Sequence, residues 1–198
     1  MDTLLTRGDY HAQPPKQSFM NQHRRTITQV NAFKFEQFMN AFGSVFEHSP
    51  WVAEQTWSKL PFASVDALHR ALCETLAQSS DEKQLALIRA HPDLVGRAAV
   101  AATLTPASHR EQAGAGLDSL RPQDVAAFQS FNQRYRDQFG FPFIICARLN
   151  TKDAILAAFP VRLKNNRDEE IRTALTEIYK IARLRLLDLV KDSGPPAS

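Results

Sequence analysis

Residues 168–191, DEEIRTALTEIYKIARLRLLDLVK, form the clearest periodic stretch of this 198-residue chain. Apolar side chains recur in it at spacings of three and four residues, which is the period of one helix face. They are Ile171, Ala174, Leu175, Ile178, Ala182 and Leu189. The stretch therefore predicts a long helix with one buried stripe, closed by Gly-Pro-Pro at 194–196.

The same period runs through most of the preceding chain. We expect further helices within residues 31–46, 50–59, 64–76, 81–90, 105–120, 121–140 and 151–159. Ser64 and Thr151 are suitable caps, Gly140 marks a helix end, and Pro160 is expected to kink or break the helix before it. Only residues 143–147 suit a strand, and they have no evident partner. The sequence predicts an all-α fold, a single-domain helical bundle of about seven to nine helices.

Composition sets the limits of the domain. Residues 1–29 are polar and aperiodic and predict a flexible tail; residues 30–192 form the helical domain, and residues 193–198 a disordered C-terminus. A surplus of three positive charges does not indicate nucleic acid. No run reaches the roughly 18 apolar residues of a membrane span. Cys73 and Cys146 are far apart in the sequence, which favours a reduced, cytoplasmic setting.

His91 is the first candidate for chemistry. It directly precedes Pro92, whose ring disfavours the helical conformation for the residue before it, so the helix of residues 81–90 should end there. Position alone favours a histidine that hydrogen-bonds the last helix carbonyls. The functional alternative is a general acid or base held at a rigid helix exit.

Ser108, Glu111 and Gln112 make a second group with two interpretations. The spacing of Ser108 and Glu111 is that of a capping box, and spacing alone favours that structure. If the segment is helical, however, all three side chains share a face. A hydroxyl, a carboxylate and an amide then suit a heterocycle rich in donors and acceptors.

Arg185 lies on the apolar stripe of the last helix, seven residues after Ile178. A buried cation needs an anion, which is either a protein carboxylate or the carboxylate of a substrate. Residues 139–147, FGFPFIICA, are mostly core, yet Gly140 and Pro142 interrupt helix there. Backbone amides and carbonyls in this segment are therefore candidates for contact with a flat polar ligand. No histidine or cysteine spacing indicates a metal, and no glycine-rich phosphate loop indicates a cofactor.

Four motifs in order resemble the family of 2-oxo-4-hydroxy-4-carboxy-5-ureidoimidazoline (OHCU) decarboxylases. They are HPDL at 91–94, S-x-x-EQ-x-x-AGLD at 108–118, FGFPFIICAR at 139–148 and KI-x-x-LRL at 180–186. The resemblance covers roughly residues 31–190. The resemblance implies an all-α, cofactor-free carboxy-lyase that forms (S)-allantoin in urate and purine breakdown, takes a small-molecule substrate and forms a homodimer.

The resemblance also implies a set of site residues. His91, Glu111 and Arg185 match the catalytic positions. The substrate-binding positions match Pro92, Ser108, Glu111, Gln112, Phe143, Ile144, Ile145, Cys146, Ala147 and Arg185. Two other readings stay open: a homologue acting on another ureido heterocycle, and a non-catalytic helical binding module that uses Lys164, Arg167 and the basic tail. The acidic residues interleaved along the last helix favour a solvated face over such a module.

Overall fold

A computed structural model describes residues 24–95 and 104–193 and confirms a mostly α-helical fold. The helices are α2 (Ile27–Asn31), α3 (Phe35–Phe42), α4 (Trp51–Thr56), α5 (Val65–Ala77), α6 (Asp81–Ala90), α8 (Pro106–Gly114), α9 (Pro122–Phe139), α10 (Lys152–Arg162) and α11 (Arg167–Leu189). Two 3₁₀ turns, η1 (Trp57–Lys59) and η2 (Ala147–Leu149), and two short strands, β1 (Arg25–Thr26) and β2 (Val190–Lys191), complete the described elements. None of the helices in these ranges is long and apolar enough to cross a membrane.

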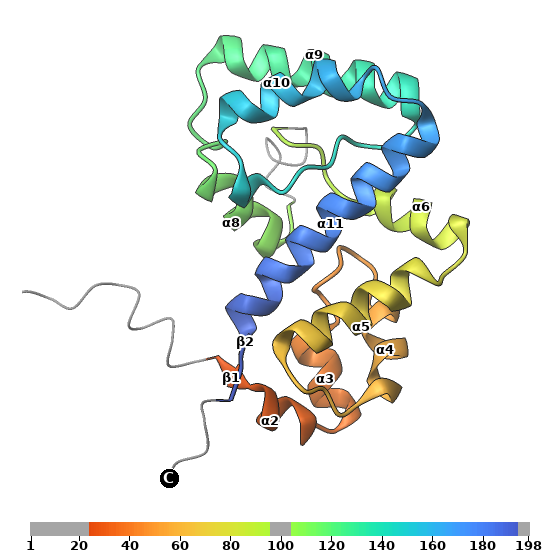
Figure 1. Ribbon diagram of the computed structural model, residues 1–198. Helices are drawn as coiled ribbons and strands as arrows, with labels where there is room; N and C mark the ends of the chain where they lie inside the picture. The colour runs from red at the N-terminus through yellow and green to blue at the C-terminus, as the bar shows by residue number, and fades with distance from the viewer. Residues whose placement is uncertain (1–23, 96–103, 194–198) are drawn as a thin grey trace, which may run out of the picture.

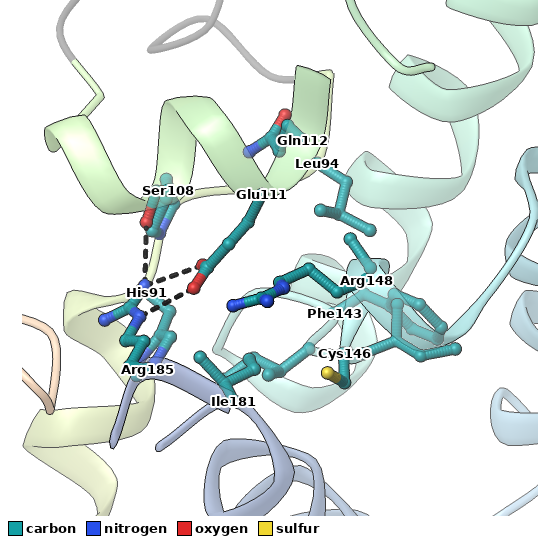
Figure 2. A pocket seen from close by; sticks show the side chains of 14 residues that line it. His91, Leu94, Ser108, Glu111, Gln112, Phe143, Cys146, Arg148, Ile181 and Arg185 are labelled. Carbon is teal, nitrogen blue, oxygen red and sulfur yellow. Dashed lines mark hydrogen bonds and ion pairs between the residues drawn. The ribbon is translucent and has the colours of Figure 1, made fainter. Parts of the chain in front are cut away.

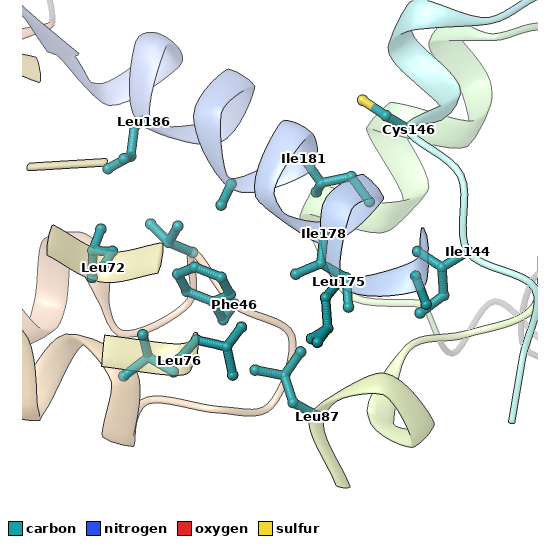
Figure 3. Packing of buried hydrophobic residues seen from close by; sticks show 14 of the residues in the cluster. Phe46, Leu72, Leu76, Leu87, Ile144, Cys146, Leu175, Ile178, Ile181 and Leu186 are labelled. Atoms are coloured by element: carbon teal, nitrogen blue, oxygen red, sulfur yellow. The ribbon is translucent and has the colours of Figure 1, made fainter. Parts of the chain in front are cut away.

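The long helix α11 runs diagonally between two groups of helices (Figure 1). The pair α9 and α10 lies beyond one end of it, and α2 to α5 lie beside the other. Ile178 and Ala182 are buried as the period predicts, whereas Leu189 is 39% exposed, so the stripe ends earlier than expected. Apolar residues of α5 and α6 pack against one side of α11, and residues 144–146 face another (Figure 3). The helix therefore joins the core to the segment that carries the candidate site.

Several local predictions are confirmed. The Ser64 side chain accepts a hydrogen bond from the amide of Ala67 and caps α5, and the Thr151 side chain caps α10 in the same way. Helix α6 ends at Ala90, with His91 in extended conformation before Pro92. Helix α9 ends at Gly140, whose φ of 76° is left-handed and suits glycine.

The prediction of a flexible tail over residues 1–29 is wrong for residues 25–29. Arg25 and Thr26 pair in parallel with Val190 and Lys191, and Ile27 is buried. A two-residue strand is too short to produce a sequence period, so the pattern gave no signal. Residues 1–23 lie outside the described residues. At the other end Ser193 hydrogen-bonds Thr28 at 2.6 Å between their hydroxyl oxygens, and residues 194–198 are outside the described part.

The expected break at Pro160 is also wrong. Helix α10 continues through it to Arg162, and the amide of Leu163 donates to the carbonyl of Phe159. Pro160 itself is exposed, so water can solvate the carbonyl that loses its partner. Phe159 and Arg162 on either side of it are buried and hold the helix in place.

Arg162 is the buried cation that joins α10 to α11. Its Nε donates to Glu170 at 2.5 Å, and its Nη1 donates to the carbonyl of Ile144 at 2.5 Å. Tyr135 donates its hydroxyl hydrogen to the same carboxylate. Glu170 has no solvent exposure, so its charge depends on these donors.

Arg162→Ala leaves the buried Glu170 carboxylate without its cation. We expect the free energy of unfolding to fall by about 3–5 kcal/mol, measured by urea denaturation followed by circular dichroism. The control Arg172→Ala, at an exposed position of α11, should stay within about 0.5 kcal/mol of the wild type. Equal stability of the two variants would contradict the role of this ion pair.

Candidate active site

Four separate segments meet around one cavity (Figure 2). They are the end of α6, one face of α8, the irregular segment before η2, and α11. The structure brings together every site residue expected from the sequence, namely His91, Pro92, Ser108, Glu111, Gln112, Phe143, Ile144, Ile145, Cys146, Ala147 and Arg185. Leu94, Arg148 and Ile181 also line the cavity and were not anticipated.

His91 makes the contact with a late helix carbonyl that its position suggested. Its Nδ1 lies 2.9 Å from the carbonyl oxygen of Leu87, one turn earlier in α6. A carbonyl only accepts, so Nδ1 carries the hydrogen and Nε2 keeps a lone pair. Burial lowers the pKa of His91 to about 4, so the ring is neutral near pH 7. A neutral imidazole with a free lone pair beside a cavity is equipped to act as a base.

The capping box expected of Ser108 and Glu111 is wrong. Thr105 caps α8 instead, because its hydroxyl accepts from the amide of Ser108. Ser108 is therefore inside the first helical turn, and its hydroxyl donates to Glu47 at 3.1 Å. Both Ser108 and Glu111 are free of capping and face the cavity.

Arg185 forms the buried ion pair that was one of its two interpretations. Its Nε and Nη2 each donate to Glu111, at 2.8 Å, in a two-pronged arrangement. Its Nη1 donates to Glu47 at 3.0 Å and to the carbonyl of Val45 at 3.2 Å. The geometry of the two bonds to Glu111 fixes that carboxylate in one orientation.

Glu47 is a buried site residue that sequence reasoning missed. Only 2% of it is exposed, and one carboxylate oxygen accepts from Thr105 at 2.7 Å. Burial alone would raise the pKa of Glu47, but the hydrogen bond from Thr105 and the charge of Arg185 outweigh it and hold the pKa below its ordinary value. Glu47 lies in a loop after α3, where no period marks an inward side chain. Glu47 falls between the predicted helices of residues 31–46 and 50–59, so no helix face was predicted at its position.

Some polar groups of Gln112 and of residues 143–147 already form hydrogen bonds within the protein. The Gln112 side chain accepts from the amide of Val95 at 3.1 Å, and its Nε2 donates to the carbonyl of Asp93 at 3.4 Å. The amide of Cys146 donates to Glu177 at 2.8 Å. These bonds hold the loop after α6 and the segment before η2 in fixed positions around the cavity.

A metal centre is not indicated within residues 24–95 and 104–193. No group of three or more His, Cys, Asp or Glu side chains there is arranged to hold a metal ion. The polar groups at the cavity are a neutral imidazole, a carboxylate held by a guanidinium, the second guanidinium of Arg148, a hydroxyl, an amide and backbone groups.

Known proteins resemble this chain over nearly all of the described domain. The family model of OHCU decarboxylase matches residues 31–187. The 2-oxo-4-hydroxy-4-carboxy-5-ureidoimidazoline decarboxylase of Haloferax volcanii is 46% identical over 166 residues, which cover 84% of this chain and 96% of that protein.

Two solved structures resemble its fold. A crystal structure of (S)-allantoin synthase matches with a TM-score of 0.65 and 29% identity, covering 83% of this chain and 54% of that one. A structure of OHCU decarboxylase in the presence of (S)-allantoin matches with a TM-score of 0.59 and 26% identity, covering 72% and 92%.

The protonation state of His91 is directly measurable by nitrogen-15 NMR of the histidine rings. We expect the His91 ring to stay neutral, with hydrogen on Nδ1, from about pH 5.5 to 8, because burial disfavours the charged form. Spectra of His91→Asn identify its signals by their loss. Titration of the ring near the ordinary histidine value of about 6.5 would contradict the geometry.

Proposed function

This chain belongs to the OHCU decarboxylase family, and on that premise we propose that it converts 2-oxo-4-hydroxy-4-carboxy-5-ureidoimidazoline to (S)-allantoin and carbon dioxide in urate breakdown. The observation that carries the proposal is the position of His91. Its ring lines a cavity with its Nδ1 hydrogen-bonded to Leu87, and the side chain of Glu111 lines the same cavity.

The substrate explains why such a site needs no cofactor. Its carboxylate is attached to a ring carbon next to a C=N bond. When the bond to carbon dioxide breaks, its electron pair forms a C=C bond between the two ring carbons. The electrons of the C=N bond move to the nitrogen, which takes up a proton from water. The product of this step is an enol, which becomes allantoin when the hydroxyl proton leaves and a proton arrives on the carbon that bears the ureido group.

His91 is suited to move these protons. Its neutral ring first accepts the proton of the hydroxyl group through Nε2, and the resulting imidazolium then donates to carbon. Delivery from one fixed ring protonates one face of the enol, which accounts for a single enantiomer. The bond from Nδ1 to Leu87 favours the charged ring that forms between the two steps.

The other polar groups orient the substrate in this proposal. Glu111 keeps lone pairs beyond the two bonds to Arg185, and these accept from the N–H groups of the ureido chain or ring. Ser108 donates to Glu47 and accepts from Arg185, so one lone pair of its hydroxyl oxygen is left for the substrate. Gln112, Pro92 and the backbone of residues 143–147 complete the enclosure. Arg185 acts mainly by holding Glu111 and by balancing charge.

Assembly and location remain part of the proposal. We expect a homodimer in the cytoplasm, as the family resemblance implies. Light scattering coupled to size-exclusion chromatography measures the mass in solution, and a mass of about 22.3 kDa, that of one chain, would contradict the dimer.

His91→Asn removes the proton carrier while keeping a polar side chain. We expect turnover to fall by about 10²–10⁴-fold, the usual contribution of general acid–base catalysis. The substrate is generated from urate by the two upstream enzymes, and circular dichroism follows the rise of (S)-allantoin above the spontaneous racemic background.

His109→Asn is the matched control, because His109 is exposed on α8 and does not line the cavity. It should retain wild-type turnover. Near-normal turnover of His91→Asn would remove His91 from the mechanism. A wild-type chain that leaves the background unchanged would favour another ureido heterocycle as substrate.

A further inference from the structure

Arg148 is a second guanidinium at the cavity, and the steps described so far leave it without a role. It lies in η2 directly after residues 143–147, and Figure 2 shows its guanidinium pointing toward the carboxylate of Glu111. Its Nη1 and Nη2 donate to Asp188 of α11 at 2.6 and 3.1 Å. Arg148 also lines a neighbouring hollow, whose other lining residues include Asp188, Glu111 and Arg185. It therefore stands where the two hollows meet.

The charges around the cavity leave the substrate carboxylate without a cation. Glu47 and Glu111 are two carboxylates against the single guanidinium of Arg185. His91 adds no positive charge, because its ring is neutral. The nitrogens of Arg185 are bonded to Glu111, Glu47, Val45 and Ser108. Apart from Arg148 and its partner Asp188, an incoming anion therefore meets one guanidinium and two carboxylates.

Arg148 is able to supply that cation. About a third of its side chain is exposed, and its partner Asp188 is 43% exposed, so water screens their ion pair. A carboxylate inside the cavity is less well solvated and attracts the same guanidinium more strongly. The hydrogen bonds to Asp188 raise the pKa of Arg148, and the charge of Glu111 adds to the effect. Arg148 also lines the cavity itself.

We propose that Arg148, positioned between the two hollows, leaves Asp188 to pair with the carboxylate of the entering substrate. This inference rests on the proposed function and adds a residue that recognises the anionic group. It also has a consequence for kinetics. The carboxylate becomes neutral carbon dioxide, so a cation paired with it stabilises the bound substrate and not the departing product. Removal of Arg148 should therefore raise KM and should not lower kcat.

Arg148→Gln removes the charge and keeps a polar side chain at the mouth of the cavity. We expect KM to rise about 10-fold or more, the loss of one charge-assisted contact, with kcat changed by less than about 3-fold. Affinity for (S)-allantoin, which lacks the carboxylate, should stay within about 2-fold of the wild type, measured by calorimetry.

Asp188→Asn is the matched control, because it breaks the same ion pair and keeps the guanidinium. Its KM should equal or fall below that of the wild type. The proposal is overturned if Asp188→Asn behaves like Arg148→Gln, if Arg148→Gln weakens allantoin as much as substrate, or if Arg148→Gln is unchanged. A wild-type chain without activity is a separate result, which removes the proposed function and this inference with it.

Discussion

The positive charge of Arg185 on the buried side of α11 is the constraint on which the site depends. A guanidinium that is 6% exposed is tolerated only when anions surround it, and removing one partner of such a group costs far more than the group contributes. Glu111 comes from α8 and Glu47 from the loop after α3, so one charge ties three distant parts of the chain together. Because the buried guanidinium needs these two carboxylates, burying it also fixes the segments that surround the cavity.

The rest of the site follows from rigid neighbours. His91 is placed by the end of α6 and held by Leu87, and Ser108 is freed for the cavity because Thr105 takes over the cap of α8. The segment that carries Ile144 and Cys146 has no helix or sheet of its own. It is held instead by Arg162 on one side and Glu177 on the other. Each of these side chains thus sits on a backbone fixed by a separate set of bonds, which is how proteins preorganise a site.

The sequence predicted the parts of this arrangement that local physics determines. The end of α6 at His91 follows from Pro92, and the burial of Arg185 follows from its place in a 3.6-residue period. Contacts between residues from distant segments could not be predicted from local sequence patterns. Glu47 lies in a loop without periodicity, and its hydrogen bond from Ser108 joins residues that are 61 positions apart. The pairing of β1 with β2 joins residues more than 160 positions apart, which no local pattern reveals.

That pairing brings the two ends of the described chain together. Arg25 lies against Val190, and Thr28 touches Ser193, so the polypeptide enters and leaves the domain at one place (Figure 1). A domain with adjacent ends behaves as a self-contained module: it can be spliced into a loop of a host protein, or have its ends joined and be reopened elsewhere, with little strain on the core. In evolutionary terms such a helical unit is easily combined with other catalytic domains in one polypeptide.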